Sequence, residues 1–179
     1  MAVRILCMED DPGIARLMTK RLEKSGYVVD YAENGEKGLA KYAEGAFDIL
    51  LVDAHMPVMG GVEVIRVLVG RGDRIPVVMV TGSGDEATAV AALKSGARDY
   101  LIKDVEGRFI DLLPALVEKV LAQHTLQMEK EQALADLRES EERFRGIIET
   151  THDYYWALEI NDPNDFSKAV IVLGSRGLG

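Results

Sequence analysis

Five short apolar runs alternate with longer amphipathic segments over roughly the first 122 residues of the chain. Each run has the length of a β-strand. The first, third and fourth runs are almost continuously apolar, which is typical of strands covered on both faces of a sheet. The second run alternates apolar and polar positions, which favours a place at or near a sheet edge. The predicted strands are residues 5–8, 28–31, 48–52, 77–80 and 100–102.

The segments between these runs repeat apolar residues every three to four positions, as a helix with one buried face does. Asp11 followed by Pro12 predicts the N-cap and first residue of the first helix. We expect Gly70 and Gly72 to follow the third helix. The apolar positions that mark the five helices are Ile14, Leu17, Met18 and Leu22; Leu39, Tyr42 and Ala43; Val62, Ile65, Leu68 and Val69; Val90 and Leu93; and Ile110, Leu113, Val117, Val120 and Leu121.

Strands that alternate with helices predict an α/β fold with a doubly wound parallel sheet, covered by helices on both faces. In open sheets of this kind, ligands bind beyond the carboxyl ends of the strands. The residues that follow the five predicted strands are therefore the first candidates for chemistry.

The composition changes at Ala122. Glycine and proline are absent until Gly146, and Gln, Glu, Leu and Arg dominate, which predicts a helix that continues the fifth helix to about Glu149. When Leu113 is taken as position a of a heptad repeat, seven of the eleven a and d positions of this helix are apolar. The pattern fits a coiled coil between two copies of the chain, or a single solvated linker helix. The positions are Leu113, Leu116, Val120, Gln123, Gln127, Lys130, Leu134, Leu137, Glu141, Phe144 and Ile148.

Composition argues against several kinds of partner. The chain has 30 Asp and Glu against 21 Lys and Arg, a formal net charge of −9, which disfavours nucleic acid and anionic membranes. No apolar stretch reaches the ~20 residues of a membrane span. Acidic residues begin at Glu9, too early for a signal peptide, and the single cysteine, Cys7, fits a reducing compartment. We expect a soluble, cytoplasmic protein with no nucleic-acid or membrane partner.

Charged and hydroxyl side chains follow the predicted strands at the ends that a parallel sheet brings together. They are Glu9 and Asp10, Asp53, Thr81 and Lys103. At an effective dielectric constant of 20, two carboxylates about 4 Å apart repel by roughly 4 kcal/mol, so cations must offset them. Lys103 supplies one charge, and Mg²⁺, which prefers carboxylate, water and phosphate oxygens, would supply two. Such a set suits phosphoryl transfer with a carboxylate as nucleophile.

Four segments, taken in order and at their spacings, resemble the receiver domain of two-component response regulators. They are ILCMEDDP at the first strand, DILLVDAHMPVMGG around Asp53, PVVMVTGSG around Thr81 and GARDYLIKD around Lys103. The resemblance covers about residues 3–122. It implies a flavodoxin-like, five-stranded parallel sheet in the order 2-1-3-4-5. It also implies phosphorelay signalling, in which a histidine kinase or phosphotransfer protein is the partner and no substrate is turned over.

The resemblance implies a role for each residue at the strand ends. Asp53 would be the phosphoacceptor. Lys103 would pair with its carboxylate before transfer and with a phosphoryl oxygen afterwards. The implied Mg²⁺ ligands are Glu9, Asp10, Asp53 and the backbone carbonyl of His55.

Two further residues would form a switch. Thr81 would donate its hydroxyl to the phosphoryl group, and Tyr100 would change its exposure as Thr81 moves. Phosphorylation would then alter the face made by the fourth helix, the fifth strand and the fifth helix.

Three positions depart from the family's usual pattern. Asp104 follows Lys103, where such domains commonly have a proline, often with a cis bond. A cis bond without proline costs about 2.5–4 kcal/mol, so we expect a trans bond and a different loop. Gly60 replaces an acidic residue, which leaves the turn to Gly61, and Glu9 replaces an aspartate, which leaves the metal site intact.

The last part of the chain predicts a third region. ESEERFRGIIETTHDYYWALEIND resembles the entrance to a PAS sensory domain. About thirty residues cannot build a core of their own. We therefore expect a receiver domain over residues 1–122, a helical linker over 123–149, and the truncated start of a PAS-like domain over 150–179.

Two other functions stay open. The segment GSGDEA over residues 82–87 fits the G-x-G-x-x-A pattern of dinucleotide-binding folds, although it follows the fourth strand and not the first. A receiver-like module used only for protein binding is the second alternative. Such a module would tend to lack the acceptor, the metal carboxylates or the lysine, and all of these are present.

Overall fold

The fold is described here for residues 2–82, 84–150, 155–159 and 170–174 of a computed structural model, with side chains described through residue 145. Five parallel strands form one sheet in the order β2-β1-β3-β4-β5, which confirms the predicted topology and the edge position of β2. The strands are β1 (Arg4–Met8), β2 (Val28–Ala32), β3 (Ile49–Asp53), β4 (Val77–Gly82) and β5 (Asp99–Lys103). The helices are α1 (Pro12–Lys24), α2 (Gly35–Glu44), α3 (Gly61–Arg71), α4 (Glu86–Ser95) and α5 (Phe109–Thr150).

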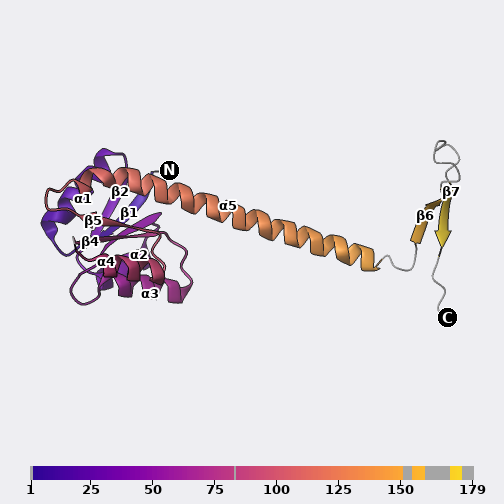
Figure 1. The fold of residues 1–179 in the computed structure, drawn as a ribbon, viewed down its shortest axis with the longest axis horizontal. Helices are drawn as coiled ribbons and strands as arrows, with labels where there is room; N and C mark the ends of the chain where they lie inside the picture. The colour runs from indigo at the N-terminus through magenta and orange to yellow at the C-terminus, as the bar shows by residue number, and fades with distance from the viewer. Residues whose placement is uncertain (1, 83, 151–154, 160–169, 175–179) are drawn as a thin grey trace. The chain divides into compact units, whose positions relative to one another are not determined.

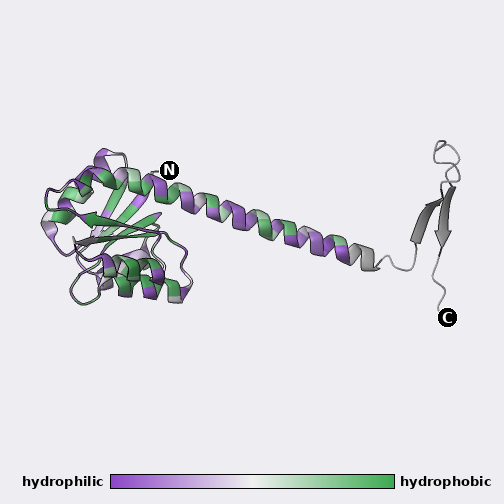
Figure 2. Cartoon of the chain, in the orientation of Figure 1, coloured by the Kyte–Doolittle hydropathy of each residue, from purple (hydrophilic) through white to green (hydrophobic). Residues whose placement is uncertain are grey.

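Two apolar layers hold the helices against the sheet. Figure 1 shows α1 and the first turns of α5 on one face, and α2, α3 and α4 on the other. Successive residues of a strand point to opposite faces, so each central strand supplies both layers. Figure 2 shows the strands of the sheet as largely hydrophobic, whereas hydrophobic and hydrophilic residues alternate along the helices. One layer contains Ile5, Cys7, Ile49, Leu51, Val78 and Val80, and the other contains Leu6, Met8, Leu50, Val52, Val77 and Met79.

Local signals in the sequence set most of the helix ends. The Oδ1 atom of Asp11 accepts hydrogen bonds from the backbone N–H groups of Gly13 (2.7 Å) and Ile14 (3.0 Å), which confirms the predicted N-cap. The predicted end of the third helix was wrong for Gly70, which lies inside α3. The helix ends at Arg71, and Gly72 follows it as the cap with a left-handed backbone, φ 78°.

The structure divides the chain into two compact units, residues 1–126 and 127–179. α5 is continuous through residue 150, which confirms that the linker continues the fifth helix. Within the second unit, β6 (Tyr155–Glu159) pairs antiparallel with β7 (Val170–Gly174). Among the described residues, no helix combines the length and apolarity needed to cross a membrane.

Candidate functional site

The carboxyl ends of the strands bring the predicted site residues to one rim of the sheet. Glu9 and Asp10 follow β1, and Asp53 is the last residue of β3. Thr81 lies next to the end of β4, and Lys103 is the last residue of β5. The β4–β5 register pairs Gly82 with Lys103, so the lysine lies level with the end of β4. The parallel sheet thus assembles residues that lie up to 94 positions apart in the sequence.

Lys103 links two buried carboxylates. Its Nζ atom lies 2.7 Å from Glu9 Oε2 and 2.7 Å from Asp53 Oδ1. Glu9 is 1% exposed and Asp53 is 6% exposed, so this ammonium group is shared where little water screens it. Burial by itself would lower the pKa of Lys103, but the hydrogen bonds to Asp53 and Glu9 outweigh burial and raise it. The lysine is therefore charged at neutral pH.

Three carboxylates meet at this rim and leave it negative. Glu9, Asp10 and Asp53 each offer one oxygen, and these oxygens lie within 4.8 Å of one another. Burial raises the pKa of the Glu9 carboxyl, and the Asp53 charge raises it further, while the hydrogen bond from Lys103 opposes both. One ammonium group offsets only one of the three charges. The donor set and its residual charge therefore fit a hard divalent cation such as Mg²⁺.

The β3–α3 loop places the backbone of the site close to α3. The His55 N–H donates a hydrogen bond to Asp53 Oδ2 (3.3 Å), so the residue two positions after the strand helps to orient the carboxylate. A Cβ on Gly61 would lie 2.4 Å from the Asp53 carbonyl oxygen. A side chain at Gly61 would therefore clash with the strand that carries Asp53, which explains glycine at the predicted turn position.

The hydroxyl of Thr81 has an acidic partner that the sequence analysis missed. Thr81 is 1% exposed and donates a hydrogen bond to Asp85 Oδ2 (3.0 Å). The Nε2 atom of His55 lies 2.5 Å from the same oxygen. Asp85 featured in the sequence only within the rival glycine motif, and its spacing of four from Thr81 across a loop carries no recognisable signal. Tyr100, the second predicted switch residue, lies on β5 with 39% of its surface exposed.

The loop after β5 has the trans connection that Asp104 predicted. The described residues contain no cis peptide bond. The Oδ1 atom of Asp104 accepts a hydrogen bond from the Phe109 N–H (2.8 Å), and Oδ2 accepts one from Arg108 Nε (3.1 Å). Asp104, at the position where the family commonly has proline, thus ties the loop to the first residues of α5.

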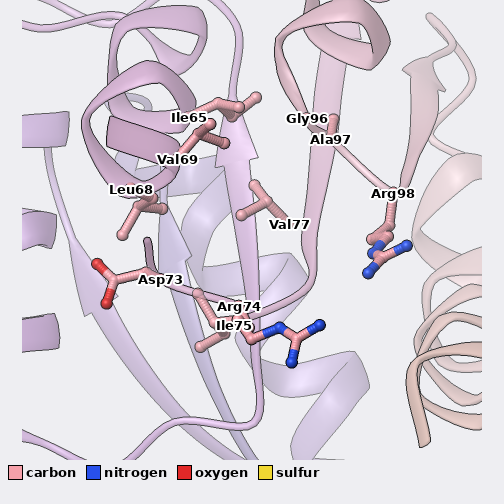
Figure 3. Close-up of a pocket in the computed structure, with 10 residues that line it drawn as sticks. All are labelled: Ile65, Leu68, Val69, Asp73, Arg74, Ile75, Val77, Gly96, Ala97 and Arg98. Atoms are coloured by element: carbon pink, nitrogen blue, oxygen red, sulfur yellow. The ribbon is translucent and has the colours of Figure 1, made fainter. Parts of the chain in front are cut away.

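A groove of about 390 Å³ lies away from this rim. It is formed at the amino end of β4, where Val77 begins the strand, and between the ends of α3 and α4. Figure 3 shows the guanidinium groups of Arg74 and Arg98 on one side and the Asp73 carboxylate on the other. Because the site residues lie at the opposite ends of the strands, the groove is separate from the carboxylate cluster.

Comparison with known proteins settles the family. Residues 5–113 match the profile described as "Response regulator receiver domain". The chain belongs to the response regulator receiver family. The chain is 36% identical over 109 residues to the transcriptional regulatory protein ResD of Bacillus subtilis, covering 61% of this chain and 45% of ResD. It is 38% identical over 103 residues to the response regulator MprA of Mycobacterium tuberculosis, covering 58% of this chain and 45% of MprA.

A solved structure supports the same assignment of the receiver domain. The CheY-like receiver domain protein of Methanospirillum hungatei superposes with a TM-score of 0.62 at 32% identity, covering 71% of this chain and 99% of that one. The chain spans about half the length of ResD and MprA. The family match over residues 5–113 and these relatives are consistent with the predicted phosphorelay role.

Proposed function

We propose that the receiver domain accepts a phosphoryl group on Asp53 from a histidine kinase or phosphotransfer protein. The observation that carries this proposal is the pair of 2.7 Å contacts from Lys103 to Glu9 and Asp53 beside a third carboxylate, Asp10. A carboxylate oxygen of Asp53 attacks phosphorus, and the bond from phosphorus to the donor's histidine nitrogen breaks. The product on Asp53 is an acyl phosphate.

The residues around Asp53 supply positioning and charge. Glu9, Asp10, Asp53 and the carbonyl of His55 would hold Mg²⁺, which supplies charge neutralisation on the phosphoryl oxygens when it is bound. Lys103 holds the Asp53 carboxylate in place before transfer and is within reach to pair with a phosphoryl oxygen afterwards. Because phosphoryl transfer depends mainly on positioning and electrostatics, these groups suffice without a covalent partner other than Asp53.

Phosphorylation acts as a switch in this proposal. Thr81 donates its hydroxyl to the new phosphoryl group, and Tyr100 follows its movement. The affected face comprises α4, β5 and α5, where apolar side chains are already partly exposed. They are Val90, Leu93, Tyr100, Ile102 and Leu112. The domain is a signalling switch and performs only its own phosphorylation and dephosphorylation.

The rest of the chain connects the switch to an output. We propose that residues 123–149 are a helical linker that pairs with the linker of a second copy through its a and d positions. Leu134, Leu137 and Phe144 support this pairing, since they are exposed in the single chain. Residues 150–179 are proposed as the start of a PAS-like domain. The structure describes the pairing of β6 with β7 in this region, and residues 151–154, 160–169 and 175–179 lie outside the described residues.

Incubation with acetyl phosphate and Mg²⁺, followed by intact-mass measurement, tests the acceptor. The wild type gains a phosphate adduct that hydroxylamine removes, because hydroxylamine cleaves acyl phosphates. Asp53→Asn gains none. Asp73→Asn, which makes the same change at the groove at the far ends of the strands, keeps the adduct. An adduct on Asp53→Asn, or none on the wild type in the presence of bound Mg²⁺, contradicts the proposal.

A further inference from the structure

Asp85 occupies a helix-cap position without using its side chain as a cap. It immediately precedes α4, yet no backbone N–H of the helix donates to its carboxylate. The carboxylate instead accepts hydrogen bonds from Thr81 on β4 and from the side chain of Thr88 in the first turn of α4. The carboxylate also contacts the Nε2 atom of His55, a residue of the β3–α3 loop. A side chain that served only to begin the helix would accept from the backbone.

The hydrogen bond from Thr81 to Asp85 competes with the hydrogen bond that a phosphoryl group requires. A threonine hydroxyl carries a single proton, so it donates one hydrogen bond at a time. In this structure the proton is directed to Asp85 Oδ2 at 3.0 Å. Thr81 therefore cannot donate to a phosphoryl oxygen on Asp53 until its bond with Asp85 breaks.

Asp85 is a strong acceptor for this bond. Its hydrogen bonds with Thr88, and after it with His55, lower the pKa of its carboxyl below the ordinary value. The group is therefore ionised at neutral pH, and hydrogen bonds to ionised acceptors are stronger than neutral ones. A phosphoryl group that recruits Thr81 must displace this acceptor.

We propose that Asp85 is a positioning residue that holds the Thr81 hydroxyl in the unphosphorylated state and ties it to the first turn of α4. This inference rests on the proposed function of Asp53. Asp85 joins β4, the β3–α3 loop and α4 through its hydrogen bonds with Thr81, His55 and Thr88. Release of Thr81 breaks the first of these three bonds. The contact thus couples the rotation of one hydroxyl to the position of a helix on the output face, and it keeps the switch off before phosphorylation.

The affinity for beryllofluoride, an analogue of the phosphoryl group on an aspartate, measures this restraint. A ¹⁵N NMR titration of the full chain in saturating Mg²⁺ gives the affinity and shows whether each variant is folded. Asp85→Ala binds about tenfold more tightly than the wild type, because the competing hydrogen bond to a charged acceptor is absent. Asp85→Asn keeps a neutral acceptor and lies between the two. It decides the matter if the alanine variant does not fold.

Two controls separate this restraint from a general effect of charge or helix stability. Glu86→Ala removes an adjacent negative charge from the first turn of α4. This variant keeps the hydrogen bond between Thr81 and Asp85, so its affinity for beryllofluoride stays within about twofold of the wild type. In a Thr81→Ala background, Asp85→Ala gives no tightening, since the two changes remove the same hydrogen bond.

The outcomes distinguish this proposal from that for Asp53. Equal affinities for Asp85→Ala, Asp85→Asn and the wild type overturn the role of Asp85 and leave the acceptor assignment in place. Tightening that persists without Thr81 also overturns it, because the effect would then belong to the charge alone. Beryllofluoride that binds Asp53→Asn as well as the wild type refutes the acceptor assignment instead.

Discussion

Replacing Gly61 by alanine probes how closely α3 packs against the strand that carries Asp53. A Cβ at Gly61 would lie 2.4 Å from the Asp53 carbonyl oxygen and 2.9 Å from Met79 Sδ. The sulfur belongs to a flexible side chain and can move aside. The carbonyl oxygen is part of β3, and ordinary van der Waals contact begins at 3.4 Å, so strand and helix must separate by about 1 Å.

We expect Gly61→Ala to lower the free energy of unfolding by about 2 kcal/mol, the usual cost of forcing one extra methyl into a packed interior. Gly70→Ala is the matched control, because it adds the same methyl to the same helix. A Cβ at Gly70 meets nothing within 4 Å, and the residue lies inside α3. Alanine there should raise the free energy of unfolding by about 0.5–1 kcal/mol through its better helix propensity.

Urea unfolding followed by far-ultraviolet circular dichroism measures both variants, with linear extrapolation to water. Tryptophan fluorescence would not serve, because the one tryptophan, Trp156, lies outside the receiver domain. Gly61→Ala should also reduce the yield of acyl phosphate, since the separation shifts the backbone of Asp53. Equal stability of the two variants would show that β3 and α3 are not in the close contact described here.

Two further substitutions and one chemical modification test other parts of the receiver domain. Val58 has a left-handed backbone (φ 69°) and a side chain 78% exposed. Val58→Asn should therefore raise the free energy of unfolding by about 1 kcal/mol in the same urea assay, and an unchanged midpoint would contradict this backbone conformation. Asp104→Ala should lower stability at pH 7. Hydrogen bonds, chiefly from the Phe109 N–H, lower the pKa of Asp104, so its contribution is present above the ordinary value of 3.8 and is lost as the pH falls through the lowered pKa. A deficit of the same size at pH 7 and pH 2 would refute this. Burial raises the pKa of Cys7 to about 12, so an aromatic disulfide reagent at pH 8 should react only as urea unfolds the domain; rapid reaction of the folded protein would show that Cys7 is accessible.

The order of strands and helices in this protein follows from short-range patterns in its sequence. Apolar runs and helical periodicity predict the position of each strand and helix to within a few residues, because they indicate which of its faces must be buried. Asp11 indicates the first residue of α1, because its carboxylate forms the N-cap with backbone N–H groups that lie within the next three residues. The continuation of α5 beyond Ala122 could be predicted in the same way, from the absence of glycine and proline until Gly146.

The sequence pattern places the strand-end residues at one rim of the sheet, but the tertiary structure alone decided which faces pack and which further contacts form. α4 buries Ala89 and Ala92 and exposes Val90 and Leu93, although the larger pair is the more apolar, so its packed face is not the one that the periodicity predicts.

The contacts of the site depend on the same long-range packing. The two 2.7 Å contacts from Lys103 depend on the register of β5 beside β4. The hydrogen bond from Thr81 to Asp85 depends on the path of one loop. Local patterns specify elements one at a time, whereas these contacts arise only when several elements pack together.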